Sequence, residues 1–97
     1  MNFETYRIFY YTARYKNITG AAKALFLTQP TVSHAIAGLE KELGCQLFIR
    51  SKKGVQMTPE AELLYRHLSK AFQHVEDGEQ SLRDHLSLSE GQIRIVS

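Results

Sequence analysis

The stretch LTQPTVSHAIAGLEKELG, residues 27–44, combines the apolar spacing of a buried helix with a polar beginning. On a helical wheel of about 100° per residue its larger apolar residues share one face, which we expect to point into the core; they are Val32, Ile36, Leu39 and Leu43. Thr28 is a suitable N-cap, and Pro30 fits the first turn, where its missing N–H leaves no hydrogen bond unmade. Gly44 is a natural residue to end a helix. The stretch therefore predicts a helix from about residue 28 to Leu43.

The opposite face of this helix is small and hydrogen-bonding near its start; it carries Pro30, His34, Ala37 and Lys41, flanked by Ser33 and Gly38. Amide and hydroxyl groups can read base edges in the major groove of DNA, and a helix N-terminus can meet phosphates. Capping explains Thr28 and Pro30 but not the group of Gln29, Thr31, Ser33 and His34. A solvated polar face explains that group equally well, so both interpretations stay open on this stretch alone.

The segments on either side complete a small fold. Residues 3–15 repeat apolar positions at helical spacing behind Asn2, a good N-cap, and predict a first helix. We expect Thr19 to cap a short second helix whose Ala21, Ala22 and Leu25 face inward. After Gly44, the segments CQLFIR (45–50) and GVQMT (54–58) flank a basic turn and indicate a β-hairpin. A mainly α fold follows: a winged helix-turn-helix, with three helices and a short hairpin as the wing.

A long helix is predicted to begin at Thr58-Pro59, with threonine as the N-cap and proline as the first helical residue. Its apolar residues continue at three- and four-residue spacing over about three heptads; they are Ala61, Leu64, Leu68, Ala71, Val75 and Leu82. Only the first turn or two of this stripe can pack on so small a core. We therefore expect a second copy of the chain to cover Leu64, Leu68, Val75 and Leu82. Gly91 ends the predicted helix, and QIRIVS (92–97) is typical of a β-strand that opens another domain.

Composition and charge narrow the class of protein. The chain has 97 residues, of which 43% are hydrophobic and 23% charged, so neither disorder nor a membrane span is indicated. Residues 1–58 carry eight lysines and arginines against three acidic residues, a net charge of +5, whereas residues 59–97 carry four against seven, a net charge of −3. This asymmetry predicts that the front half meets a polyanion. Arg50, Lys52 and Lys53 on the hairpin are suited to grip a nucleic-acid backbone beside the third helix.

Other chemistries find little support in the sequence. Cys45 has no second thiol for a disulfide or a metal site, so we expect a reducing cytoplasm and a role as a small packing residue. His67, His74 and His85 lack the spacing that lets two histidines of one helix share a metal. No nucleophile–base pair, carboxylate pair or phosphate-binding glycine loop stands out. We therefore predict no enzyme, no cofactor and no metal site.

These pieces together resemble the N-terminal domain of LysR-type transcriptional regulators, from about Phe3 into the long helix. The matching motifs are NITGAAKALFLTQPTVSHAIAGLEKELGCQLFIR (17–50) and MTPEAELL (57–64). The resemblance implies a homodimer paired through its long linker helices, often doubled to a tetramer, that binds an interrupted palindrome in double-stranded DNA. It also implies an effector-binding domain that takes a small co-inducer. We expect a DNA-binding domain at 1–58, a linker and dimerisation helix at 59–90, and the start of an effector-binding domain at 91–97.

The resemblance also implies a set of site residues. Base contacts carry over to Gln29, Pro30, Thr31, Ser33 and the position of His34. Backbone contacts carry over to Thr28, Arg50, Lys52 and Lys53. Where relatives commonly carry arginine or lysine, this chain has His34, Ala37 and Gly38, so the phosphate grip is expected to be weaker or to shift to the hairpin, Lys16 and Lys23. Gly38 either permits a close approach to DNA or to the hairpin, or is an unselected surface residue.

A winged helix that docks a partner protein is the alternative function. Such a module needs an aromatic or aliphatic anchor on the exposed face of its third helix. That face, from Pro30 to Lys41, carries none. Double-stranded DNA is therefore the predicted partner.

Overall fold

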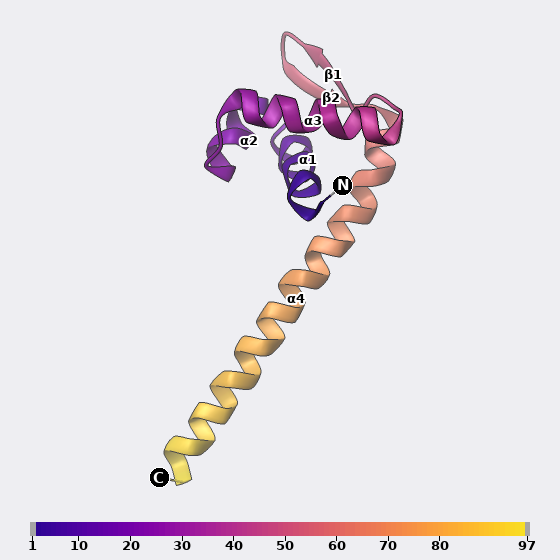
Figure 1. The fold of residues 1–97 in the computed structure, drawn as a ribbon. Helices are drawn as coiled ribbons and strands as arrows, with labels where there is room; N and C mark the ends of the chain where they lie inside the picture. The colour runs from indigo at the N-terminus through magenta and orange to yellow at the C-terminus, as the bar shows by residue number, and fades with distance from the viewer. Residues whose placement is uncertain (1, 97) are drawn as a thin grey trace.

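The computed structural model describes the backbone of residues 2–96 and the side chains of residues 2–88. Its elements follow in the order α1 (Phe3–Tyr15), α2 (Ile18–Leu25), α3 (Gln29–Leu43), β1 (Phe48–Ser51), β2 (Gly54–Met57) and α4 (Pro59–Val96). Residues 3–58 form a head domain, from which α4 leaves as a single long helix (Figure 1). At about 1.5 Å per residue its 38 residues extend about 57 Å, which accounts for the 61 Å length of the molecule.

Capping sets the helix boundaries, and three predicted ends are confirmed. The Thr28 side chain accepts the N–H of Thr31 at the start of α3, and Gly44 ends that helix with φ 76°. The Thr58 hydroxyl accepts the N–H of Ala61 at 3.1 Å and so caps α4. These boundaries follow from local chemistry.

The prediction that Thr19 caps the second helix is wrong. The helix begins at Ile18, and the Asn17 side chain accepts the N–H of Gly20 at 3.0 Å. Asparagine is preferred over threonine at an N-cap, so the earlier residue takes this role. Thr19 lies inside the first turn, and its hydroxyl is left for another partner.

The core lies between α1, α2, α3, the base of the hairpin and the first turn of α4, and Ala21, Ala22 and Leu25 of α2 face inward as predicted. Val32, Ile36 and Leu39 are buried as predicted. Leu43 is 38% exposed, so its prediction as a core residue is wrong. Leu43 is the last residue of α3, next to the Gly44 cap. This end of the helix is exposed, since Glu42 and Gly44 on either side of Leu43 are exposed as well.

The hairpin, here called the wing (residues 48–57), pairs in antiparallel register from Phe48 opposite Met57 to Ser51 opposite Gly54. The ring of Phe48 lies 5.4 Å from that of Phe9 in the core. The N–H of Val55 donates to the carbonyl oxygen of Lys16 at 3.2 Å. A Cβ atom on Gly54 would overlap that same oxygen, so glycine permits the close approach. The wing is thereby attached to the C-terminal end of α1.

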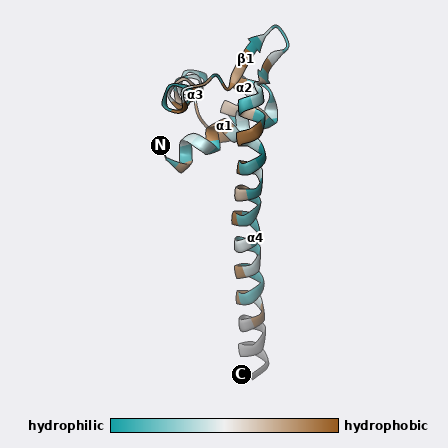
Figure 2. Cartoon of the chain, turned by 90° about the vertical axis from the view of Figure 1, so that its right-hand side faces the viewer, coloured by the Kyte–Doolittle hydropathy of each residue, from teal (hydrophilic) through white to brown (hydrophobic). Residues whose placement is uncertain are grey.

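The first part of α4 packs on α1 through aromatic rings. The Tyr10 ring stacks on Tyr65 at 5.1 Å, and Phe72 lies 4.8 Å from Tyr10 and 5.1 Å from Phe3. Beyond Glu76 the described part of the helix extends away from the head domain, and apolar residues recur along it in the open (Figure 2). Apart from α4's first turns, its apolar stripe is therefore exposed, as the sequence predicts.

The helix continues past Gly91 to Val96, so the strand predicted for QIRIVS is wrong over residues 92–96. Ser97 lies outside the described residues. A helix satisfies its own backbone hydrogen bonds, whereas a strand at this place has no neighbouring strand among the described residues. One glycine in a helix costs only about 1 kcal/mol, too little to stop it.

Within the described residues, no helix is long and apolar enough to cross a membrane.

Phe26 and Gly44 offer a matched test of the helix ends, because both adopt the left-handed conformation. A side chain in that conformation costs about 1–2 kcal/mol, whereas glycine loses about 0.5–1 kcal/mol more chain entropy on folding. The Phe26 side chain is 96% exposed and gains little from burial. We expect Phe26→Gly to raise the free energy of unfolding by roughly 0.5–1 kcal/mol.

Gly44→Ala is the control, since nothing lies within 4 Å of an added Cβ atom and only the backbone conformation is tested. It should lower the free energy of unfolding by about 1 kcal/mol. Thermal unfolding at one fixed protein concentration measures both variants. A lower midpoint for Phe26→Gly would contradict the argument and show that the exposed ring itself stabilises the fold.

Candidate nucleic-acid interface

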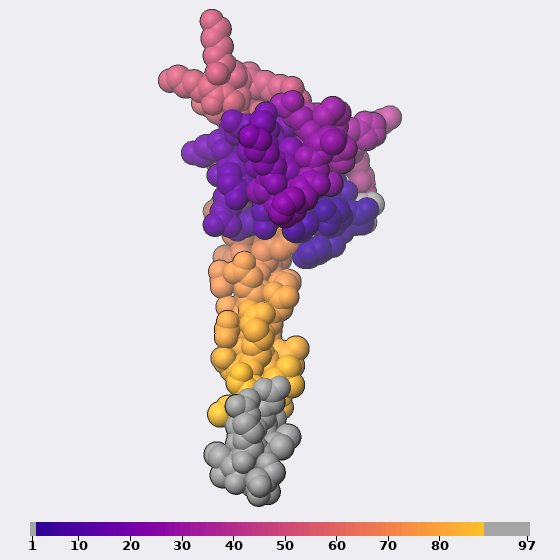
Figure 3. Space-filling view, turned by 90° about the vertical axis from the view of Figure 1, so that its left-hand side faces the viewer, coloured from indigo at the N-terminus to yellow at the C-terminus, as the bar shows by residue number. Residues whose placement is uncertain are grey.

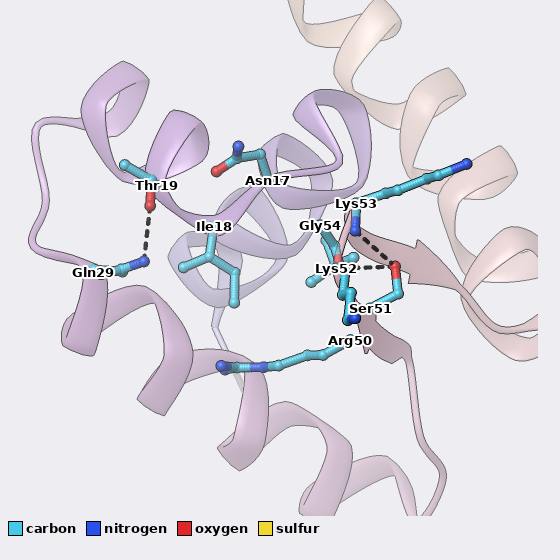
Figure 4. A pocket seen from close by; sticks show the side chains of 10 residues that line it. Asn17, Ile18, Thr19, Gln29, Arg50, Ser51, Lys52, Lys53 and Gly54 are labelled. Carbon is cyan, nitrogen blue, oxygen red and sulfur yellow. Dashed lines mark hydrogen bonds between the residues drawn. The ribbon is translucent and has the colours of Figure 1, made fainter.

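A polar groove of about 340 Å³ runs between the start of α3 and the wing. Its lining comes from three segments far apart in the sequence: Asn17, Ile18 and Thr19 at the start of α2, Gln29 of α3, and residues 50–55 of the wing. Figure 4 shows these side chains around the opening. Of the residues predicted from the sequence, the groove brings together Gln29, Arg50, Lys52 and Lys53.

Gln29 is the first residue of α3 and is exposed. Its Nε2 donates to the hydroxyl oxygen of Thr19 at 2.8 Å, across the turn between α2 and α3 (Figure 4). The amide is therefore held by a second helix.

The other predicted contacts at the start of α3 are also at the surface. Thr28 and Thr31 share a hydrogen bond between their hydroxyls at 2.7 Å, and Pro30 lies beside them, exposed. Capping by Thr28 leaves these hydroxyls facing outward at the positive end of the helix dipole, where anions are favoured.

Ser33 and Arg50 meet across the gap between α3 and the wing. The Nη2 of Arg50 donates to the Ser33 hydroxyl oxygen at 3.2 Å. Arg50 therefore carries its positive charge to the side of a helix that has no lysine or arginine between Pro30 and Glu40. The sequence assigned these two residues separate roles and gave no sign of this contact.

Further along α3, His34, Ala37, Gly38 and Lys41 are exposed, as the helical wheel predicts. Nothing in the protein lies within 4 Å of a Cβ atom built on Gly38. A close approach to the wing is therefore not the reason for this glycine. A close approach to DNA stays a prediction, and an unselected surface residue stays the alternative.

The remaining predicted cations lie around this face. Lys52 and Lys53 form the turn of the wing, and Lys16 and Lys23 are exposed on α1 and α2 outside the groove. Figure 3 shows the wing projecting from the head domain with long side chains reaching outward. In the described residues no cluster of histidine, cysteine and carboxylate side chains is suited to hold a metal ion.

The predicted dimer residues divide into two groups. Leu64 and Leu68 are half-buried against the head domain, whereas Val75 and Leu82 are 47% and 57% exposed. A small apolar groove between α1 and α4 is lined by Phe3, Tyr10, Tyr11, Phe72 and Val75, together with the charged residues Arg7, Arg14 and Glu76.

Sequence reasoning missed the roles of Asn17 and Thr19 at the groove. The sequence contained a signal for the Asn17 cap, because asparagine is preferred over threonine as an N-cap and Gly20 stands three residues later, where its N–H can donate to the cap side chain. If Asn17 is taken as the cap, the Thr19 hydroxyl is not needed for capping and is available to contact the polar start of α3. The Arg50–Ser33 contact had no comparable local signal.

Comparison with known proteins gives a consistent result. Residues 3–62 match the family described as bacterial regulatory helix-turn-helix protein, lysR family. The chain is 40% identical over 84 residues to the HTH-type transcriptional regulator CzcR of Bacillus subtilis (strain 168), covering 87% of this chain and 29% of that protein. It is 33% identical over 95 residues to the nitrogen assimilation regulatory protein nac of Escherichia coli (strain K12), covering 98% of this chain and 31% of that one.

A solved structure agrees with these relatives. The BenM DNA-binding domain in complex with benA site 1 DNA superposes with a TM-score of 0.76 at 32% identity, covering 90% of this chain and 97% of that one. The chain thus spans about three tenths of the length of these curated relatives but nearly all of this domain. With the family match over most of the head domain and the winged helix-turn-helix in place, this chain belongs to the lysR family of bacterial regulatory helix-turn-helix proteins.

Proposed function

We propose that this chain is the DNA-binding and dimerisation segment of a transcriptional regulator that binds specific double-stranded DNA as a homodimer. It acts in the cytoplasm, by binding rather than by catalysis. The observation that carries the proposal is the start of α3, where exposed amide and hydroxyl groups stand between α2 and a basic wing. The complex of the similar BenM domain with DNA supports the same conclusion.

Base recognition is assigned to Gln29, Pro30, Thr31, Ser33 and His34. Their small polar groups are suited to a major groove, which admits a helix and presents a distinct pattern of donors and acceptors for each base pair. Arg50 reinforces this face from the wing through its bond to Ser33. Thr28, Lys16, Lys23, Lys52 and Lys53 are assigned to phosphates, which position the protein without reading sequence.

Removing the Gln29 amide should relax the preference at one base pair in each half-site. Selection of binding sites from a random duplex pool, applied to wild type and Gln29→Ala, measures this. We expect discrimination at that pair to fall by about 1–3 kcal/mol. Gln80→Ala, on α4 far along the chain, should leave the selected sequence unchanged.

A pool from which wild-type protein selects no sequence would contradict the proposal. That result would favour the protein-interaction module instead. Its natural anchor is Phe26, which is 96% exposed in the turn just before α3.

The wing lysines should govern the salt dependence of binding. Each phosphate contact removed should lower the slope of log K against log salt by about 0.9. We expect Lys52→Met and Lys53→Met each to reduce the slope by about 1.8 per dimer and to weaken binding to all sequences alike. Titration between about 50 and 200 mM salt measures the slope, with Arg83→Met on α4 as the control. Unchanged slopes in both lysine variants would contradict the assignment.

The homodimer is supported by α4 itself. Its exposed stripe, continued by Leu86, has no cover within the described residues, and contiguous exposed apolar surface is typical of interaction sites. Charge favours an antiparallel pairing, because Arg7 and Arg14 line the apolar groove beside Phe72 and Val75, with Glu76 as the one acidic residue there, whereas Asp77, Glu79 and Asp84 follow further along α4. An antiparallel partner brings the acidic segment beside the arginines.

A charge on the stripe should therefore separate the dimer. We expect Leu82→Glu to give monomers at micromolar concentration in sedimentation, because burying an unpaired carboxylate is strongly unfavourable. Leu63→Glu is the matched control, since Leu63 is similarly exposed at 53% but lies off the stripe. A wild-type chain that sediments as a monomer would overturn the proposed dimer.

The further expectations from the family resemblance concern more than these 97 residues. Tetramer formation, a small co-inducer and the effector-binding domain assigned to begin at 91–97 stay predictions. The matched segment is only 29% and 31% of the length of the two curated relatives, so these properties concern parts of such proteins outside the match. The recognition of an interrupted palindrome follows from the proposed two-fold symmetry of the dimer.

A further inference from the structure

The Thr19 hydroxyl has no role in forming the helix on which it stands. Asn17 caps α2, and Thr19 lies exposed in its first turn. Its oxygen instead accepts the N–H from Nε2 of Gln29 at 2.8 Å, ten residues along the chain and on another helix (Figure 4). The bond therefore restrains the Gln29 side chain and is not part of the cap of α2.

The chemistry of the amide makes this contact useful. A glutamine amide has two N–H groups and one carbonyl oxygen. Bidentate recognition of adenine uses the oxygen and one N–H, which meet the N6 and N7 positions of the base. The other N–H is then free for a partner in the protein, and Thr19 supplies that partner.

We propose that Thr19 is a positioning residue for base recognition: its hydroxyl holds the Gln29 amide in the orientation that presents one N–H and the oxygen to a base edge. The inference rests on the proposed function. Without the bond, the amide must be ordered when DNA binds. Ordering a flexible side chain weakens an interaction by roughly 2- to 12-fold, so the sequence preference at that base pair falls by this factor when Thr19 lacks its hydroxyl.

A direct contact between Thr19 and a phosphate is the competing role, and it has different consequences. A phosphate contact strengthens binding to every sequence alike, whereas a positioning contact strengthens only the match to the preferred base. A phosphate contact also persists when Gln29 is removed. A positioning contact has no effect once the amide it positions is gone.

The experiment uses the full chain and the base pair that Gln29→Ala identifies. Affinities for the preferred duplex and for the same duplex changed at that pair are measured for wild type, Thr19→Val and Thr19→Ser. Valine keeps the branched shape of threonine without the hydroxyl, and serine keeps the hydroxyl. The double variant Thr19→Val/Gln29→Ala completes the cycle, and thermal unfolding of each variant confirms that the exposed position leaves the fold intact.

We expect discrimination at that pair to fall by roughly 2- to 12-fold in Thr19→Val and to be kept in Thr19→Ser. The same valine substitution should change nothing in the Gln29→Ala background. Undiminished discrimination in Thr19→Val, or an equal loss for both duplexes that persists without Gln29, would overturn the inference and leave the proposed function standing. Wild-type protein that does not distinguish the two duplexes would overturn both.

Discussion

The carboxylate of Glu40 joins α3 to the wing. Its Oε2 accepts the N–H of Leu47 at 2.7 Å and that of Phe48 at 3.3 Å, both in partly buried surroundings. Hydrogen bonds to an ionised acceptor are roughly twice as strong as those between neutral groups. Just after the other strand, Thr58 donates its hydroxyl to the carbonyl oxygen of Gln46 at 2.7 Å and its N–H to that of Leu47. The end of α3, the base of the wing and the start of α4 therefore form one junction.

This junction determines where Arg50 can reach. Side chains two residues apart on a strand share a face, so Arg50 lies on the same face as Phe48, whose side chain is buried against the core. The guanidinium is thereby directed back towards α3, where it meets Ser33. The opposite residue of the pair, Val55, bonds to Lys16 and fixes the other side of the wing. Two attachments, at Glu40 and at Lys16, thus set the angle between wing and helix.

Local chemistry made most of the fold predictable. The caps at Thr28, Gly44 and Thr58 and the helical spacing of α3 depend on residues within a few positions of one another. Two predictions failed for different reasons. Two neighbouring residues could cap α2, and Asn17 does so instead of Thr19; Leu43 has the helical spacing of a core residue but lies past the part of α3 that packs on the core. For the candidate site, the exposed polar face was predictable from the wheel. The partners of its side chains were not, because they stand on other helices or on the wing.

The scarcity of charge on α3 has a structural consequence. The residues proposed to read bases stand on the helix, whereas the nearest arginine stands on the wing, so their separation depends on the attachments at Glu40 and Lys16. In a helix that carries its own arginine, both functions move together on DNA. Here a change in the wing angle moves the cation relative to the bases. On the proposed function, we therefore expect a Cβ atom on Gly54, which has no room beside the Lys16 carbonyl, to alter the DNA sequence that is selected as well as the strength of binding.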